Sequence, residues 1–168
     1  MKIYIVGPVA SGKSTLARQL SERLRIPCHS LDEVVHISDK SNPWGNRKRS
    51  VEERDKLFSS IISQKDWIAE DTGRPCFEEA LKEADRIILL EISTKIRKYR
   101  IMKRWIKQRI GLEKCIYKPC YQMLKWMFKW SKDYDKGRDN LKERLLPYKE
   151  KIIILRKNKE VKEFLLKT

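Results

Sequence analysis

The sequence lacks any long apolar run. No stretch approaches the roughly 18 consecutive apolar residues that a membrane-spanning helix needs, and the opening MKIYIVG is too short for the apolar part of a secretory signal. We therefore expect a cytoplasmic protein with no membrane partner. At 168 residues and 40% hydrophobic content, the chain is long enough for a single domain over residues 1–168 with a sizeable core.

Residues that bind soft metals are also scarce. The chain has only two histidines and four cysteines, and no two cysteines have the Cys-x-x-Cys spacing of a zinc site. These residues are His29, His36, Cys28, Cys76, Cys115 and Cys120. We expect four free thiols and no structural metal.

One long segment contains no acidic residue. Residues 93–110 have eight Lys or Arg and no Asp or Glu, and residues 111–132 add five lysines against one glutamate. The two segments together carry a net +12 of the formal net charge of +16. A field of that size attracts polyanions such as nucleotide phosphates, nucleic acid or an acidic surface.

Strand and helix patterns alternate along the chain without an internal repeat. The predicted strands are 2–6, 27–31, 67–70, 86–92 and 151–155. The predicted helices are 13–24, 51–64, one that opens near Pro75 and continues through EEALKEA, 93–110, 121–131, 137–146 and a last one capped by Asn158, while 38–50 is a predicted loop. Helices of this length serve as right-handed crossovers, so the alternation predicts an α/β fold with a largely parallel sheet.

Residues 7–15, GPVASGKST, match the phosphate-loop pattern G-x-x-x-x-G-K-[ST] without a mismatch, between a predicted strand and a predicted helix. Backbone N–H groups and the positive end of the helix dipole bind phosphate oxygens in such loops. Lys13 is expected at the β- and γ-phosphates and Ser14 on Mg²⁺. The predicted ATP-binding residues are Gly7, Pro8, Val9, Ala10, Ser11, Gly12, Lys13, Ser14 and Thr15.

Acidic residues stand at the ends of predicted strands, the edge at which ligands bind in a doubly wound sheet. Glu70 is the candidate that holds Mg²⁺ through water, together with Ser14. Asp32 is a candidate catalytic and acceptor-binding residue, although it could instead cap a helix. Glu91 is interpreted as a solvated strand end. Arg74 follows Glu70 closely and is a candidate for contact with the acceptor.

A helical projection of residues 95–110 separates an apolar stripe from a basic one. The apolar stripe, which we expect to pack on the domain, consists of Tyr99, Met102, Ile106 and Ile110. The basic stripe, which we expect to face solvent or a cleft, consists of Arg97, Arg100, Arg104 and Lys107. Arginine forks bind phosphate oxygens, so Arg100 and Arg104 are predicted to be catalytic and Arg97 to bind substrate. The alternative is a plain solvated basic face.

Basic and aromatic residues are interleaved over 112–134. This segment is open to three interpretations: a lid over the active site, a surface whose rings stack on nucleic-acid bases, or an amphipathic helical hairpin.

These features together resemble the adenylate kinase-like P-loop kinases, and most closely small bacterial proteins described as DNA topology modulation or FlaR-related proteins. The resemblance covers essentially the whole chain. Its segments are GPVASGKSTLA, IPCHSLDEV, EERDKLFSSIISQKDWIAE, ADRIILLEIS, RKYRIMKRWIK and LLPYKEKIIILRKNKEVKEFL.

The resemblance implies a three-layer α/β/α fold whose five-stranded parallel sheet has the order 2-3-1-4-5. It also implies an acceptor-binding insertion at about 33–65, a basic helix and lid at about 93–134, ATP and Mg²⁺, and arginines that close over the transferred phosphate. One departure is Asp71, because such proteins usually have glycine after the acid of the third strand.

The predicted function is that of a kinase which moves the γ-phosphate of ATP to a nucleotide, a nucleoside or another hydroxyl acceptor. The alternative is a nucleotide-dependent DNA-binding protein that affects DNA topology, with residues 93–132 as its nucleic-acid surface. The sequence specifies neither the acceptor, nor ATP over GTP, nor the oligomeric state.

Overall fold

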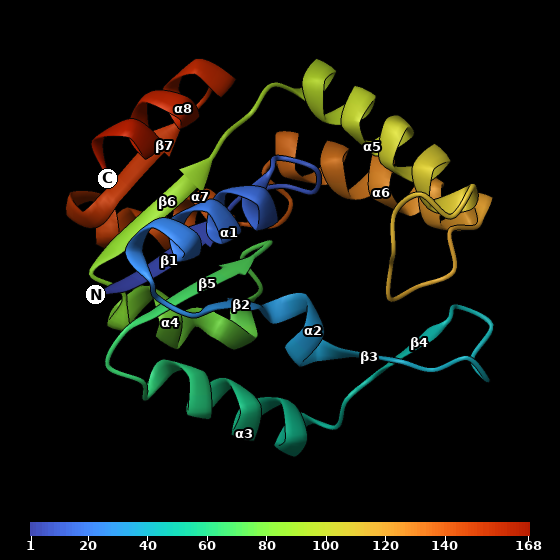
Figure 1. Cartoon of the computed structure of the whole chain (residues 1–168), viewed down its shortest axis with the longest axis horizontal. Coiled ribbons are helices and arrows are strands. Elements are labelled where there is room, and N and C mark those ends of the chain that lie inside the picture. Colours follow the sequence, from blue (N-terminus) through green and yellow to red (C-terminus); the bar gives the residue numbers. More distant parts are fainter.

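A five-stranded parallel sheet forms the middle layer of the computed structural model, which describes residues 1–168 (Figure 1). Its strands are β1 (Lys2–Val6), β2 (Cys28–Ser30), β5 (Trp67–Asp71), β6 (Arg86–Leu90) and β7 (Ile152–Leu155). They lie in the order β2-β5-β1-β6-β7, and every neighbouring pair is parallel. Counted within this sheet, the order is 2-3-1-4-5, and the predicted α/β class is confirmed.

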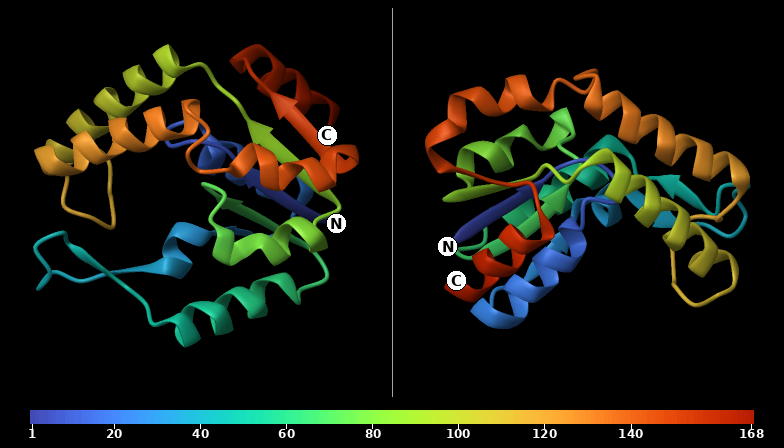
Figure 2. Two further views of the ribbon diagram at one scale, coloured as in Figure 1. Left: turned by 180° about the vertical axis from the view of Figure 1, so that it is seen from behind. Right: turned by 90° about the horizontal axis from the view of Figure 1, so that it is seen from above.

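Helices cover both faces of the sheet (Figure 2). On one face lie α1 (Lys13–Leu24) and α8 (Asn158–Lys167). The other face is covered by α3 (Val51–Ile62), η1 (Pro75–Phe77), α4 (Glu78–Glu83) and α7 (Leu141–Leu145), and η2 (Leu146–Lys151) leads from α7 into β7.

The central strand β1 shows why both layers form. Ile3 and Ile5 belong to the core shared with α1, whereas Tyr4 and Val6 belong to the core shared with α3 and α4. Successive side chains of a strand point to opposite faces, so an uninterrupted apolar run such as this one needs a layer on each side.

Two arms extend from the sheet beyond the carboxyl ends of its strands (Figures 1 and 2). The hairpin arm, residues 31–48, consists of α2 (Leu31–Val35) and the antiparallel strands β3 (His36–Ser38) and β4 (Asn46–Lys48), after which α3 returns the chain to the sheet. The basic arm, residues 94–135, consists of α5 (Thr94–Arg109) and α6 (Tyr121–Asp135). The tips of the arms meet, because Lys118 N donates a hydrogen bond of 2.7 Å to the backbone oxygen of Trp44.

Two local predictions are wrong. Residues 46–48 were predicted as loop but form β4, whose letters NRK offer no apolar alternation to signal a strand. Asn158 does not cap the last helix but is its first residue, and its side-chain oxygen accepts a hydrogen bond from Arg100 instead.

The predicted orientation of the basic helix is also wrong. The stripe expected to pack on the domain is exposed, and Arg97 of the opposite stripe is buried. Ile101 of α5 instead packs on Leu124 and Met127 of α6. A helical projection separates an apolar side of a helix from a basic side, but it does not show which side packs against the neighbouring helix.

No helix combines the length and the apolar character that crossing a membrane requires.

Candidate active site

The phosphate loop joins β1 to α1 and has the backbone geometry of an anion site. Gly7 and Gly12 have φ angles of 149° and 104°, in the region that glycine adopts without strain, and Ala10 has φ 60°. Gly12 is the N-cap of α1, and no side chain caps the helix. The free N–H groups of the first turn therefore remain available to phosphate oxygens.

Gly7 is required by a close approach to the next strand. A Cβ atom at this position would lie 2.6 Å from the backbone oxygen of Leu90 in β6. Gly111, which also has a positive φ, has open space around the same position. Glycine at position 7 thus lets the loop leave the sheet directly beside β6.

We expect Gly7→Ala to lower the free energy of unfolding by about 1–3 kcal/mol more than Gly111→Ala does. Both substitutions place alanine at a positive φ, but φ is 149° at Gly7 and 77° at Gly111, so the larger loss at Gly7 combines the clash with Leu90 and a greater backbone strain. Urea unfolding followed by circular dichroism measures both variants. If both variants lose the same free energy of unfolding, the loop can move away from Leu90 without a measurable loss of stability.

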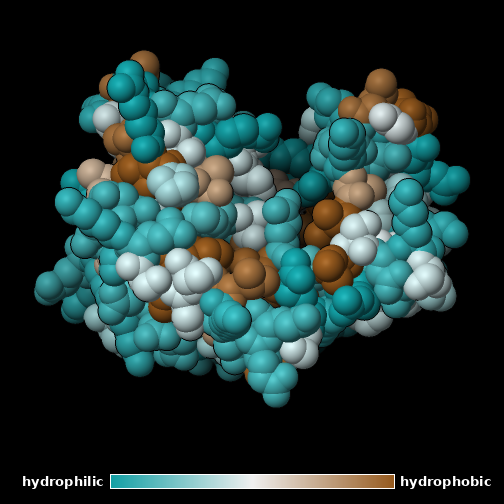
Figure 3. All heavy atoms as spheres, turned by 60° about the horizontal axis from the view of Figure 1, so that its bottom comes forward, coloured by the Kyte–Doolittle hydropathy of each residue, from teal (hydrophilic) through white to brown (hydrophobic).

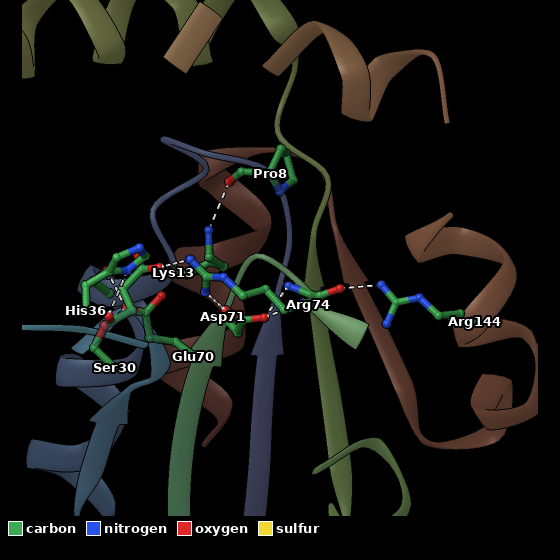
Figure 4. Close-up of polar contacts among 11 residues, drawn as sticks. Pro8, Lys13, Ser30, His36, Glu70, Asp71, Arg74 and Arg144 are labelled. Carbon is green, nitrogen blue, oxygen red and sulfur yellow. Dashed lines mark hydrogen bonds and ion pairs between the residues drawn. The ribbon is translucent and has the colours of Figure 1, made fainter. Parts of the chain in front are cut away.

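Lys13 lies inside the loop rather than in solvent (Figure 4). Its side chain is buried, and Nζ donates a hydrogen bond of 3.0 Å to the backbone oxygen of Pro8. Burial lowers the pKa of Lys13 below its ordinary value, while the nearby carboxylates of Glu70 and Asp32 act in the opposite direction. The ammonium group is held where an anionic ligand would relieve its desolvation.

Glu70, at the end of β5, accepts hydrogen bonds from two hydroxyl groups. Ser14 Oγ donates to its Oε1 at 2.9 Å, and Ser30 Oγ donates to the same oxygen at 2.8 Å. Carboxylate and hydroxyl oxygens are the ligands that Mg²⁺ prefers, so Ser14 and Glu70 fit the metal predicted for them. No group of three or more His, Cys, Asp or Glu side chains is arranged to hold a metal ion by itself. Mg²⁺ needs no such group, since it usually takes its remaining ligands from phosphate and water.

Arg74 forms ion pairs with Asp71, at the end of β5, and with Asp32, which follows β2; Figure 4 shows Arg74 beside Asp71. Its guanidinium donates to Asp71 through one nitrogen and to Asp32 through the other. The fully buried Asp71 carboxylate also accepts from the backbone N–H groups of Gly73, at 2.7 Å, and of Arg74. Asp71, the departure from the resembled family, thus caps the turn that positions Arg74.

The ion pair with Arg74 sets the charge of Asp32. Desolvation opposes ionisation, yet the Arg74 guanidinium outweighs it and holds the pKa of Asp32 below its ordinary value. The half-exposed carboxylate is therefore ionised at neutral pH and can accept a hydrogen bond from a hydroxyl group. Ser30, not Asp32, is the N-cap of α2, so Asp32 is not the helix cap of the alternative interpretation.

Arg97 takes no part in this site. Its five N–H groups all have acceptors within the protein: Ile92 O, Ser131 O, Ser131 Oγ, Thr94 Oγ1 and Asp135 Oδ1. Since a guanidinium has only five donors, none remains for a substrate. Arg97 therefore links α5 to α6. The structure does not support its predicted contact with substrate.

Arg100 and Arg104 have different partners in the structure. Arg100 Nη1 donates to the backbone oxygen of Ser11 at 2.7 Å and to that of Ala10 at 3.3 Å. It therefore touches the carbonyl side of the phosphate loop, opposite in polarity to the N–H groups that bind phosphate. Arg104 is exposed and pairs with Glu113 at 2.8 Å, towards the tip of the basic arm.

The site also includes residues that sequence reasoning missed. Ser30 supports Glu70, and its signal was a hydroxyl at the carboxyl end of a parallel strand. Arg144 of α7 donates to the backbone oxygen of Gly73 and so holds the Asp71–Arg74 turn from the far side (Figure 4). No local pattern marks Arg144, because its partner lies 71 residues away.

One face of the molecule is hollowed. Figure 3 shows a hollow in the surface between two lobes, on a face that is mostly hydrophilic. Near the tips of the arms, residues 38–45 of the hairpin arm and 115–118 of the basic arm line a cavity of about 490 Å³.

Comparison with known proteins gives a consistent result. A family model described as an AAA domain matches residues 3–115. The chain is 28% identical over 100 residues to a shikimate kinase of Pseudomonas syringae pv. tomato, a match that covers 54% of this chain and 58% of the relative. It is 32% identical over 80 residues to a shikimate kinase of Francisella tularensis subsp. holarctica, with 42% and 43% covered. The matched part thus spans little more than half the length of the first of these curated relatives.

Solved structures share the fold. The shikimate kinase of Acinetobacter baumannii in complex with shikimate aligns over 99% of this chain and 89% of its own, with a TM-score of 0.60 and 20% identity. The deoxyadenosine kinase of M. mycoides with bound dATP aligns over 99% and 98%, with a TM-score of 0.55 and 15% identity. At these identities the likeness establishes the architecture alone.

Proposed function

The chain belongs to the AAA domain family, and from this premise we propose that it is an ATP-dependent kinase that transfers the γ-phosphate to a hydroxyl group of a small molecule. One observation carries the proposal. Four side chains from three separate parts of the chain lie close together at the carboxyl edge of the sheet, through the contacts described above. They are Lys13, Ser14, Asp32 and Glu70.

Phosphoryl transfer requires mainly positioning and charge stabilisation, and these residues supply both. The loop N–H groups and Lys13 bind the β- and γ-phosphates. Ser14 and Glu70 would hold Mg²⁺, partly through water, and the ion would offset charge on the phosphate oxygens. Asp32, ionised and facing the loop, orients the acceptor hydroxyl.

The arginines divide the remaining work. Arg74 holds Asp32 in place at the acceptor side, and Arg100 supports the phosphate loop from its carbonyl side as a positioning residue. Arg104, the second arginine of α5 predicted to be catalytic, is exposed and could reach a phosphate once it leaves its ion pair with Glu113.

The acceptor is a nucleotide, a nucleoside or another hydroxyl compound. The named relatives are shikimate kinases, and the structural neighbours include a deoxyadenosine kinase, so both sugar-like and nucleoside acceptors belong in a first screen. None of these comparisons supports an effect on DNA topology or binding to nucleic acid.

ADP release in the presence of ATP, Mg²⁺ and a panel of nucleosides, nucleotides, shikimate and sugar acids tests the proposal. We expect at least one acceptor to raise the rate above that with ATP alone. Asp32→Asn is then expected to lower the acceptor-dependent rate by about 10²–10⁴, the usual range for a positioned acid or base. The exposed neighbour on α2 provides the control, Glu33→Gln, which should leave the rate unchanged. If no acceptor raises the rate, the kinase assignment fails.

A further inference from the structure

The outward face of α5 carries an apolar stripe that the fold leaves uncovered. Tyr99, Met102, Ile106 and Ile110 are 66%, 40%, 48% and 63% exposed. Their spacing of three and four residues places them on one side of the helix. Leu112, just beyond the helix, is 74% exposed. Large apolar side chains gathered in this way mark an interaction surface more often than scattered ones do.

Basic side chains border this stripe on both sides. At 100° per residue, Lys98 and Arg109 fall along one border, and Lys103 and Lys107 fall along the other. All four are exposed. The ion pairs of α5 are those of Arg97 and Arg104, so the charges of the four border residues are not neutralised within the protein.

Nothing in the protein packs over this face. In the left view of Figure 2, α5 lies along the upper edge of the molecule with α6 beneath it. The contact with α6 uses Ile101 and its apolar neighbours, which point away from the exposed stripe. The stripe is therefore accessible along the length of the helix.

We infer that this face of α5 binds the surface of an anionic lipid bilayer, with the helix lying in the plane of the interface. An apolar stripe between lysine-rich borders is the pattern of interfacial helices, whose apolar side enters the region between headgroups and acyl chains. The basic borders then contact the anionic headgroups, and the lysine stems reach along the apolar surface.

Other occupants match fewer of these observations. A second copy of the chain would bring two equally basic faces together, and their repulsion opposes pairing. Nucleic acid would satisfy the lysines, but Tyr99 is the one ring of the stripe, and Met102, Ile106 and Ile110 offer no surface on which a base could stack. A bilayer satisfies the apolar and the basic parts at once. The inference stands on the surface of α5 and does not depend on the proposed kinase activity.

Co-sedimentation of the full chain with phosphatidylcholine vesicles, made with and without phosphatidylglycerol, tests the inference. We expect binding to the anionic vesicles and little to the neutral ones. The double variant Ile106→Ser/Ile110→Ser should weaken anionic-vesicle binding about tenfold or more, because both side chains lose their apolar contact. Lys103→Gln and Lys107→Gln should each weaken it about fivefold.

The matched control is Leu166→Ser, which removes an equally exposed leucine, 75% exposed, from α8. It should bind vesicles like the unaltered chain. All substituted positions are exposed, and thermal unfolding confirms that each variant folds. Absence of vesicle binding, or unchanged binding of the isoleucine double variant, would overturn the inference. So would a loss of duplex-DNA retention or of a dimer on gel filtration as the only effect of that variant, since the face would then serve another occupant.

Discussion

Replacing Lys13 with methionine is expected to lower the rate of ADP production by about two to three orders of magnitude, the usual cost of removing one preorganised donor from a developing anion. The ammonium group is buried in the loop, 3.0 Å from the Pro8 carbonyl, whereas within the loop Arg100 contacts only the carbonyls of Ala10 and Ser11. Methionine keeps most of the side-chain volume and removes the charge. Steady-state kinetics at saturating ATP measures the effect, and Lys162→Met, an exposed change on α8, is the control.

The same variant is expected to fold at least as stably as the unaltered chain without nucleotide. Burial lowers the pKa of Lys13, so its charged form is less favourable in the fold than in the unfolded chain. Below the folded pKa that difference costs the fold free energy, and the cost shrinks as the pH rises from the lowered, folded pKa towards the unfolded pKa. Thermal unfolding at pH 7 separates the two effects. A variant that is less stable yet fully active would contradict the role given to Lys13.

Replacing Arg74 with methionine is expected to lower the free energy of unfolding by about 3–5 kcal/mol, because the Asp71 carboxylate then lies buried without its partner. Arg47→Met is the matched control. Arg47 forms a half-exposed pair with Asp39 at 3.8 Å, so its loss should cost at most about 1 kcal/mol. Urea unfolding at neutral pH measures both variants.

The pH dependence gives this prediction a second readout. The pKa of Asp32 is lower in the fold than in the unfolded chain. Desolvation raises this pKa, but the charge and the hydrogen bond of Arg74 lower it by more. The contribution of Asp32 to stability is therefore complete above the unfolded pKa of about 4 and is lost as the pH falls through the lower, folded pKa. We expect the difference between the unaltered chain and Arg74→Met to narrow in that acidic window. A difference that is equally large there would place the stabilisation elsewhere.

The phosphate loop and the strand ends could be predicted from the sequence because their signals are local. Gly7, Lys13 and Ser14 stand within one motif, and Glu70 ends an apolar strand. Parallel strands bring their carboxyl ends to one edge, so the meeting of Ser14 with Glu70 follows from the strand order.

The remaining features depend on partners that are distant in the chain. Arg97 has the same chemistry as Arg100, and only the presence of Asp135 and Ser131 on α6 decides that it is buried. Arg74 similarly becomes a partner of two acids because Asp71 caps its turn. Charge and periodicity identify such residues as polar and helical, but they do not specify which side chain meets which.

The single backbone hydrogen bond between Trp44 and Lys118 makes the path of the chain a closed loop around the cavity near the arm tips. Gly45 allows the two backbones to come this close, since a Cβ there would lie 2.9 Å from Lys118 N. One such bond contributes only about 0.5–1.5 kcal/mol, a factor of roughly two to thirteen in an equilibrium. This bond alone therefore does not hold the arm tips together, and a ligand that fills the cavity would have to supply most of the free energy that keeps it closed.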